Sequence, residues 1–449
     1  MTSDQKATIA APATASGGAI AVIRLSGEDA IAKCDSLFRG RKKLCEAEGY
    51  SVVYGRIMDG ERTVDDVLAT VFRAPHSYTG EDSVELSCHG SAYIVGEILR
   101  LLVKRGVRMA EPGEFTIRAY MNGKMDLSQA EAVADLIAST SRAAHQMAST
   151  QMRGGYSAKL DALRDELLQL TALLELELDF SEEDVEFADR DKLRTTMQQI
   201  RAEIEQLKGS FSLGNVLREG VPVAIVGAPN VGKSTLLNCL LNDDRAMVSD
   251  IAGTTRDVIE EQANIDGVVF RFLDTAGIRQ TADRLEQMGI ERTLQSIRRA
   301  RIIIRMNVAG ERDKSLDNLQ LTTDQSLIDV INKCDLNPSF TAPSSSICIS
   351  AKSGDGVDEL CRALRAKVDT SALYHGDAVV SHSRHFEALN AADEALSDAL
   401  EGLDNGLPED LLAEDIRRVI RHIAAITGRG EILSDEVLGL IFSKFCIGK

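Results

Sequence analysis

Residues 1–120 alternate short apolar runs with turn residues. Residues 19–27 (AIAVIRLSG) predict a strand, and residues 77–90 (SYTGEDSVELSCHG) predict a turn followed by a strand with alternating apolar positions. Residues 92–106 (AYIVGEILRLLVKRG) have apolar positions at helical spacing and stop at Gly106. We therefore expect an α/β domain at the amino-terminal end.

From Leu127 onward the sequence has a helical pattern instead of these short strand-like runs. Ser128 and Glu131 have the S-x-x-E spacing of a capping box, which predicts the start of a helix. Leucines then recur at helical intervals, which indicates core packing rather than a cofactor site: Leu160, Leu163, Leu167, Leu170 and Leu174. The same helical pattern returns after residue 380, so the two segments predict an all-α domain.

Residues 217–370 have a third pattern, in which strand-like runs alternate with helical ones. This is typical of a doubly wound, mostly parallel sheet. Because domain termini tend to lie close together, we interpret it as a domain inserted into the helical one. The predicted fold is a multidomain mixture of α/β and all-α parts, divided into 1–120 (α/β), 121–216 (helical, first part), 217–374 (inserted α/β) and 375–449 (helical, second part).

Composition narrows the class of protein further. The chain is 44% hydrophobic and 27% charged, which fits a soluble globular protein. No apolar run reaches the ~18 residues of a membrane span, and the start lacks the features of a secretory signal. The eight cysteines form no CxxC pair, which favours a reducing compartment, the cytoplasm. The net charge of −18 opposes nucleic acid binding on average.

The strongest chemical motif is GAPNVGKS at 227–234, which fits G-x-x-x-x-G-K-[ST] between an apolar strand and a helix. Its glycines let the backbone wrap phosphates, so that loop N–H groups point at negative charge. Lys233 would reach the β- and γ-phosphates, and Ser234 offers a hydroxyl to Mg²⁺. The expected nucleotide contacts are Asn230, Val231, Gly232, Lys233, Ser234 and Thr235.

Two further segments are predicted to sense the γ-phosphate. LDTAG at 273–277 ends another strand, and the polar loop SDIAGTTRD at 249–257 would be ordered only before hydrolysis. Thr255 of that loop would add a second protein ligand for Mg²⁺. From the first segment we expect nucleotide contacts at Asp274, Thr275, Ala276 and Gly277.

Guanine is the predicted base because of NKCD at 332–335. The carboxylate of Asp335 can accept two parallel hydrogen bonds from guanine N1–H and N2–H, whereas adenine would leave it unpaired. Such a mismatch can discriminate by ~10⁴-fold. SAK at 350–352 would support the base, so the expected contacts are Asn332, Lys333, Asp335, Ser350, Ala351 and Lys352.

Two positions depart from this pattern. Ile278 stands where many small GTPases place a Gln that orients the attacking water. The alternatives are a cation bound by Asn230, an arginine further along, or an acid, for which Glu286 is our choice although its segment also fits a solvated helix face. Arg305 and Asn307 are polar within an expected buried strand, and the pattern gives no reason for Arg305.

Together these motifs, the insertion and the carboxyl-terminal segment resemble the MnmE (TrmE) family of tRNA modification GTPases over essentially the whole chain. Generic GTPases share only the motifs of the inserted domain. The wider resemblance also rests on ATIAAPATASGGAIAVIRLSG, YTGED, CHG, PGEFTIRAYMNGKMDLSQAEAVADLI, GTTRD, DTAGIR, GIERT and GEILSDEVLGLIFSKFCIGK.

The resemblance implies a function and partners. The amino-terminal domain would form a homodimer and bind a tetrahydrofolate derivative (5-formyl or 5,10-methylene) as one-carbon donor. The chain would add an aminomethyl or carboxymethylaminomethyl group at carbon 5 of the wobble uridine of certain tRNAs. It would act with the flavin-dependent partner MnmG (GidA), as a heterotetramer. Its GTPase would need K⁺ and dimerise through the GTPase domains.

Individual positions follow from the same resemblance. The potassium ligands correspond to Asn230, Ser249, Ile251 and Thr254, with Ser249 in place of a commoner Thr, and Glu286 falls on the catalytic acid. The folate contacts correspond to Arg24, Glu85, Lys124 and Lys449. Cationic side chains suit an anionic tail, and a carboxylate can pair with an aminopyrimidine edge. Without the resemblance, we would interpret Arg24 as a surface cation and Glu85 as a residue on the solvent-exposed face of a strand. Near Asn307 the family commonly has an Asp, which this chain lacks.

The chain ends in Cys446-Ile447-Gly448-Lys449. This is not a prenylation motif, because Gly448 and Lys449 do not fit C-a-a-X. Gly448 would let the backbone approach a ligand closely, and a Cys446 thiol of lowered pKa could act as nucleophile, acid or base. The family links this cysteine to the modification, while the alternative is a buried structural Cys beside Phe445.

Two other functions stay open at this point. A regulatory GTPase of ribosome assembly or stress signalling would need neither the folate positions nor CIGK. An ATPase would require ATP to compete with GTP, which Asp335 opposes. Because the chain is acidic, we expect it to bind tRNA weakly by itself, with the flavoprotein supplying much of the basic surface.

Overall fold

In the computed structural model the chain folds into two compact units, one of residues 1–134 and 424–449 and the other of residues 135–423. No described helix combines the length and the apolar character that crossing a membrane requires. The residues that the structure describes are 7–15, 17–179, 189–242, 261–273, 294–311, 321–337, 340–343, 345–370, 378–429, 441–442 and 448.

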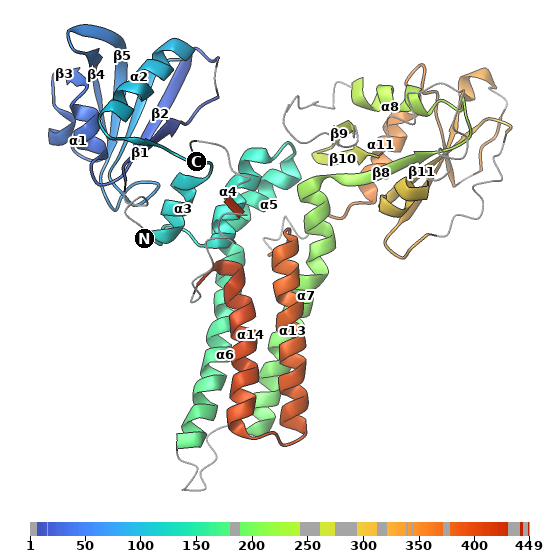
Figure 1. Cartoon of the computed structure of the whole chain (residues 1–449). Helices are drawn as coiled ribbons and strands as arrows, with labels where there is room; N and C mark the ends of the chain where they lie inside the picture. Colours follow the sequence, from blue (N-terminus) through green and yellow to red (C-terminus); the bar gives the residue numbers. More distant parts are fainter. Residues whose placement is uncertain are drawn as a thin grey trace. The chain divides into compact units, whose positions relative to one another are not determined.

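A seven-stranded sheet organises the first unit, in the order β3-β4-β5-β6-β2-β1-β7 (Figure 1). All neighbours are antiparallel except β1 and β7. The predicted strands in 19–27 and 77–90 are confirmed as β2 and β6. The strands are β1 (Ile9–Pro12), β2 (Ile20–Ser26), β3 (Phe38–Gly40), β4 (Ser51–Asp59), β5 (Arg62–Phe72), β6 (Ser83–His89) and β7 (Arg108–Met109).

Helices cover one face of this sheet. The predicted helix in 92–106 is confirmed as α2 (Ala92–Lys104), and Gly106 behind it has a φ of 76°. Its Ile98 and Leu102 are buried in one cluster with inward-facing residues of β2 and β6. The cluster also takes in residues of α1 (Ala30–Asp35) and of the short 3₁₀ helix η1 (Leu44–Glu46), whereas α3 (Glu114–Met121) follows β7 in the chain.

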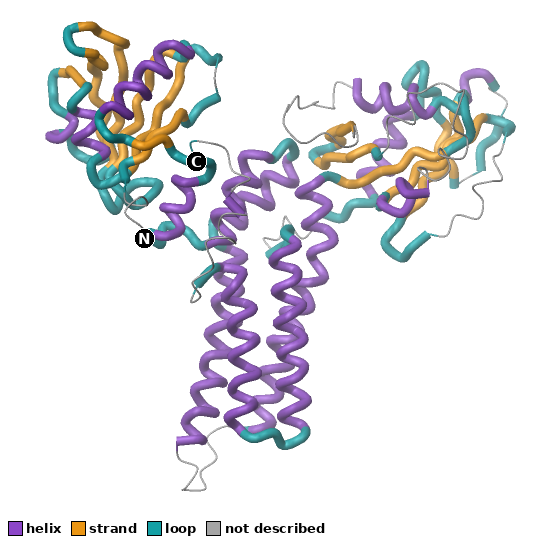
Figure 2. Tube along the Cα trace, viewed as in Figure 1, coloured by secondary structure: helices purple, strands orange, loops and turns teal. Residues whose placement is uncertain are grey.

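Long helices form the helical part of the second unit, where α7 and α13 run side by side (Figure 2). The predicted leucine stripe lies on α6, and all five of its leucines are buried. Periodic leucines that meet other helices are what stabilise such a bundle, since isolated helices are marginal in water. The helices are α5 (Arg142–Met152), α6 (Gly155–Asp179), α7 (Arg190–Glu219), α13 (Ser383–Asp404) and most of α14 (Glu409–Thr427), while α4 (Leu127–Ala138) begins in the first unit and ends in the second.

The predicted capping box at the start of α4 is wrong by two residues. Ser128 and Glu131 both lie inside the helix and are buried. Asp126 caps it instead: its Oδ1 accepts from the Gln129 N–H at 2.9 Å, and its own N–H donates to Gln129 Oε1 at 2.9 Å. The same reciprocal logic therefore applies to a D-x-x-Q pair.

A six-stranded sheet in the order β13-β12-β11-β8-β10-β9 forms the α/β part of the second unit. Its neighbours are parallel except β9 and β10, which confirms the predicted doubly wound, mostly parallel sheet. The edge strand β9 was not predicted, since EQANI is largely polar. The elements are β8 (Val221–Val226), α8 (Lys233–Asn242), β9 (Glu261–Ile265), β10 (Val268–Phe272), β11 (Ile302–Val308), β12 (Ser326–Asn332), η4 (Cys334–Leu336), β13 (Ser346–Cys348) and α11 (Val357–Ala366).

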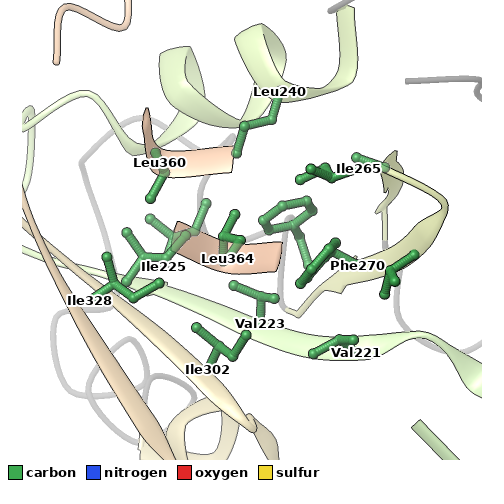
Figure 3. Packing of buried hydrophobic residues seen from close by; sticks show 14 of the residues in the cluster. Val221, Val223, Ile225, Leu240, Ile265, Phe270, Ile302, Ile328, Leu360 and Leu364 are labelled. Carbon is green, nitrogen blue, oxygen red and sulfur yellow. The ribbon is translucent and has the colours of Figure 1, made fainter. Parts of the chain in front are cut away.

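The core of this part lies between the sheet and helices α8 and α11. Figure 3 shows β8 side chains in the same cluster as Leu240 of α8, Phe270 of β10 and Leu360 of α11. Because β8 is central, residues from both its faces are buried, as its continuous apolar run predicts. A rigid β8 fixes the loop that follows it.

Candidate functional site

The loop 227–232 joins β8 to α8, as the sequence predicts for GAPNVGKS. Asn230 and Gly232 have positive φ values of 62° and 102°, so the loop curls back before the helix begins. A side chain at Gly232 would collide with Nδ2 of Asn332, which explains the glycine there. The loop therefore opens onto the amino-terminal end of α8, where N–H groups favour an anion.

Lys233 begins α8 and folds its ammonium over the loop. Its Nζ donates to the carbonyl oxygens of Gly227 at 2.8 Å and Ala228 at 2.9 Å. The positive charge is thus held against the loop in which phosphates are expected. Ser234 is half-buried and Thr235 is exposed in the next positions of the helix.

Asn332 brings three of the predicted motifs together. It is 2% exposed; its Nδ2 donates to the Val231 carbonyl at 2.7 Å, and its Oδ1 accepts from the Ala351 N–H at 2.9 Å. Lys333 has a positive φ of 62°, and its Nζ donates to the Asn230 carbonyl at 2.9 Å. The end of β12 therefore ties the phosphate loop to SAK.

Asp335 lies in η4 with its side chain exposed beside this junction. Lys352 is also exposed, whereas Ser350 is buried and its carbonyl accepts from the Gly354 N–H at 2.8 Å. The carboxylate stays open to solvent while the surrounding backbone is fixed. Such an arrangement can offer two acceptor oxygens to a planar ligand edge.

The thiol of Cys334 lies between the NKCD and SAK motifs. Burial and a hydrogen bond with Cys348 raise its pKa to about 11. It is therefore neutral near pH 7, and the arrangement gives it no nucleophilic role.

Several predicted residues lie outside the described residues. They are Ser249, Ile251, Thr254, Thr255, Asp274, Thr275, Ala276, Gly277, Glu286, Cys446 and Lys449. Their assigned roles stay predictions.

Arg305, which the apolar pattern of its strand does not explain, pairs with Asp329 on the neighbouring strand. The two residues are in register between β11 and β12. Arg305 donates to both carboxylate oxygens, from Nε at 2.5 Å and from the terminal guanidinium at 2.9 Å. A bidentate pair compensates for the partial burial of both charges.

Arg24 and Glu85, two of the predicted folate positions, face each other across β2 and β6. Arg24 Nε and a terminal guanidinium nitrogen each lie 2.9 Å from Glu85 Oε1. Neither contact uses Oε2, which accepts from no donor in the described part of the chain. The pair combines a fixed cation with a carboxylate oxygen available to a ligand.

Two aromatic rings that the sequence interpretation missed lie beside Arg24. Its guanidinium carbon is 5.2 Å from the centre of the Tyr78 ring and 5.7 Å from that of Phe115. The Tyr78 hydroxyl is 2.9 Å from the Thr116 hydroxyl, and burial raises the pKa of Tyr78. The motifs YTGED and PGEFT were the available signal, because each contributes one ring to this place.

The carboxyl-terminal tail reaches the same place. The Gly448 carbonyl oxygen is 3.4 Å from a terminal nitrogen of Arg24. A side chain at Gly448, where φ is 99°, would collide with the Pro12 carbonyl. Lys124 is exposed and donates to the Pro75 carbonyl at 3.0 Å. No contact between described residues joins it directly to Arg24.

Comparisons with known proteins agree over nearly the whole chain. A family model described as the MnmE helical domain matches residues 127–446, and one described as the GTP-binding protein TrmE N-terminus matches residues 8–124. Several relatives carry the name tRNA modification GTPase MnmE. That of Bacteroides fragilis is 50% identical and covers 98% of this chain and 99% of its own, and that of Parabacteroides distasonis is 50% identical over 98% and 100%. The relative from Christiangramia forsetii is 48% identical over 98% and 99%.

These matches confirm the resemblance found in the sequence, and they extend over the amino-terminal, helical and α/β parts alike. The chain therefore belongs to the MnmE family of tRNA modification GTPases and is a GTP hydrolase.

Proposed function

We propose that this chain is a potassium-dependent GTPase that modifies the wobble uridine of certain tRNAs at carbon 5. It acts with the flavoprotein MnmG (GidA) and uses a folate one-carbon donor to add an aminomethyl or carboxymethylaminomethyl group. The supporting observation is the meeting of Arg24, Glu85 and Gly448 in one place. A nucleotide switch alone needs no such junction between its tail and a charged pair.

The nucleotide half of the proposal uses the loop at 227–232 and the residues around Asn332. Asp335 selects guanine, Lys233 and the loop amides hold the phosphates, and Glu286 orients the attacking water. Mg²⁺ would neutralise phosphate charge, with Ser234 and Thr255 as its protein ligands. K⁺ would be held by Asn230, Ser249, Ile251 and Thr254.

The folate half uses the Arg24–Glu85 pair. The residues present fit such a ligand, because Glu85 Oε2 can accept from a pterin edge while Tyr78 and Phe115 offer aromatic surface. Lys124 and Lys449 suit the anionic tail. A bound folate would supply the one-carbon unit, and the Cys446 thiol is the group that this chain brings to the modification.

A homodimer through the amino-terminal sheet completes the proposal. Val52, Tyr54 and Leu68 are 60%, 62% and 47% exposed on adjacent strands. The register places them on the same face as Arg24 and Glu85, and exposed apolar patches of this kind mark association surfaces. We further propose a cytoplasmic location and the division into 1–120, 121–216, 217–374 and 375–449.

Nucleoside analysis of tRNA tests the proposal. A strain lacking this chain should lose the carbon-5 modification of the wobble uridine. Re-expression of Cys446→Ser should leave GTP hydrolysis near normal and fail to restore the modification. Re-expression of Cys361→Ser, which alters a half-buried cysteine of α11, should restore it.

Three outcomes would contradict parts of the proposal. Unchanged tRNA in the deletion strain would favour a regulatory GTPase, and restored modification by Cys446→Ser would remove the thiol from the reaction. Hydrolysis should also be faster in KCl than in NaCl, and equal rates would remove Asn230 from a cation site.

A further inference from the structure

The hairpin of β9 and β10 connects the two segments that the sequence predicts to be switches. Residues 249–257 precede β9, and the segment 273–277 follows β10. The hairpin is therefore the described element that adjoins both segments in the sequence. The turn between β9 and β10 is the part of the hairpin that contacts residues outside the sheet, so a movement of the hairpin could be passed on there.

The tip of this hairpin is closed by Asn264. Asp266 and Gly267 have positive φ values of 48° and 80°, as a tight two-residue turn requires. The Gly267 N–H donates to Asn264 Oδ1 at 3.1 Å. The acceptor end of the Asn264 amide is thus used inside the hairpin.

The donor end of the same amide binds the helical part of this unit. Asn264 Nδ2 donates to the Thr140 carbonyl at 3.0 Å, and the Ala143 N–H donates to the Gly267 carbonyl at 3.1 Å. Thr140 lies in the break between α4 and α5, and Ala143 lies in the first turn of α5; we name this region the α4–α5 corner (residues 139–143). Two hydrogen bonds of opposite direction hold the hairpin tip there.

Packing reinforces these two bonds. Ala143 and Met147 of α5 are 7% and 4% exposed, and they belong to the same buried cluster as Ile265 and Val268 of the hairpin. Close-packed groups transmit displacement because they have few voids to absorb it.

The helix that leads into this corner also holds both chain connections of the α/β part. Asp135 of α4 accepts from Arg218 Nε at 2.9 Å on one oxygen and lies 2.8 Å from His382 Nε2 on the other. Arg218 lies in the last turn of α7, which leads into β8, and His382 immediately precedes α13, which follows the α/β part (Figure 1). Residues 135–143 therefore contact three segments: the end of α7, where the chain enters the α/β part (the entry segment); residues 378–382, where it leaves (the exit segment); and the β9–β10 hairpin.

We propose that Asn264 is a positioning residue that couples the nucleotide state of the switches to the helical domain through the α4–α5 corner. Asp135 is the fixed point against which the hairpin tip acts, because it holds the entry and exit segments together. The coupling of hydrolysis to tRNA modification rests on the function proposed above, whereas the movement of the corner with nucleotide does not.

Asn264→Asp isolates the outward contact. The aspartate still accepts from Gly267 N–H, so the turn is kept, but it sets a second acceptor oxygen against the Thr140 carbonyl. Gln262→Glu makes the same amide-to-carboxylate change at an exposed position of the same strand and is the matched control. The first readout is amide hydrogen exchange of residues 139–152 in the full chain, with GDP and with GDP–aluminium fluoride in KCl.

We expect the two nucleotide states to differ by about tenfold in exchange at the corner for wild type and Gln262→Glu, and by less than about twofold for Asn264→Asp. GTP hydrolysis should stay within about twofold of wild type, while modification per GTP hydrolysed, measured with the flavoprotein, should fall five- to tenfold. A purely structural role would instead lower hydrolysis and thermal stability together.

An Asn264→Asp protein with the wild-type nucleotide response at the corner would overturn the inference, whether or not tRNA is modified. Absent modification by the wild-type pair would count only against the proposed function. Should Asn264→Asp not fold, Asn264→Ala removes both the donor to Thr140 and the acceptor from Gly267 without adding a repulsive oxygen, and it is judged by the same exchange measurement.

Discussion

Asn332 is a buried side chain whose two ends bind backbone groups of different motifs. Its amide nitrogen binds the phosphate loop at Val231, and its oxygen binds the SAK segment at Ala351. An amide suits this place because it offers a donor and an acceptor on one planar group. The sequence predicts Asn332 as a nucleotide contact, and in the structure its side chain also joins two backbone segments of the protein.

Asn332→Asp tests that role. The new carboxylate keeps the acceptor for Ala351 but faces the Val231 carbonyl with an oxygen, so a buried bond is replaced by repulsion. We expect a loss of about 2 to 3 kcal/mol in local stability and a clear loss of GTP affinity, measured by denaturant unfolding and nucleotide titration. Asn238→Asp, on the exposed side of α8, should change stability by less than about 0.5 kcal/mol. Similar effects in both variants would show that Asn332 does not join the motifs.

At the scale of elements, the long helix α7 carries two interior glycines with opposite surroundings. A side chain at Gly209 would meet nothing within 4 Å, whereas one at Gly214 would collide with the Val380 carbonyl. Residues 378–382, through which the chain leaves the α/β part, are bound to the same stretch of helix, since the Val380 N–H donates to Ser210 Oγ at 3.0 Å. Gly214 is therefore the place where a backbone from outside the helix passes against α7.

The two glycines predict changes of opposite sign. Gly209→Ala should stabilise the helical part by about 0.5 to 1 kcal/mol, because alanine is the better helix former. Gly214→Ala should destabilise it by about 1 to 3 kcal/mol, because the exit segment must move. Denaturant midpoints of the two variants and wild type measure the difference. Stabilisation by both alanines would mean that Val380 does not pass close to α7.

A carboxylate ties α7 to α13, and it makes stability depend on pH. Burial raises the pKa of Asp393, but hydrogen bonds from Lys208 at 2.7 Å and Arg201 at 3.1 Å outweigh burial, so its pKa is lowered overall. A lowered pKa in the folded state means that the folded protein holds the proton less tightly than the unfolded chain. Its stabilisation is therefore complete above the ordinary aspartate pKa of about 4 and is lost as pH falls through the folded value.

Asp393→Asn should accordingly cost about 1 kcal/mol of α13 stability at neutral pH. The difference from wild type should shrink as the pH is lowered from about 5 to about 3. Amide exchange of α13, or unfolding midpoints at each pH, provides the measurement. Asp398→Asn alters a more exposed pair with Arg418 and should show little of either effect. A cost for Asp393→Asn that stays constant over this range would contradict the assignment.

The elements that the sequence predicts correctly are those whose pattern lies within one short segment of the chain. The leucine stripe and the central strands are read from apolar spacing alone, and they are confirmed. The edge strand β9 was missed because an edge exposes polar side chains, and Arg305 had no explanation because its partner Asp329 is defined only by strand register. The cap of α4 was misplaced by two residues because Asp126–Gln129 and Ser128–Glu131 both fit one motif. Likewise, the rings beside Arg24 come from segments that only the fold brings together.

At the scale of the whole molecule, the charge balance limits how this chain meets a nucleic acid. The net charge is −18, and arginines of α14 are paired with acids: Arg417 with Glu175 and Glu414, Arg418 with Asp398 and Asp415, and Arg421 with Glu414. Cations already engaged in ion pairs cannot release counterions from phosphates without giving up those pairs. The acidic chain is thus poorly suited to hold tRNA by charge alone.

We expect tRNA binding to depend steeply on salt only in the complex with the flavoprotein. For that complex, log K should fall with log[KCl] at a slope of about −3 or steeper, because each phosphate neutralised by a Lys or Arg contributes nearly one unit. The chain alone should bind weakly at about 150 mM salt and show a shallow slope, because few of its cations displace counterions. Titrations over a series of KCl concentrations, repeated with the separate flavoprotein, measure both. The same affinity and slope for the chain alone as for the complex would place the RNA-binding charge on this subunit, despite its acidity.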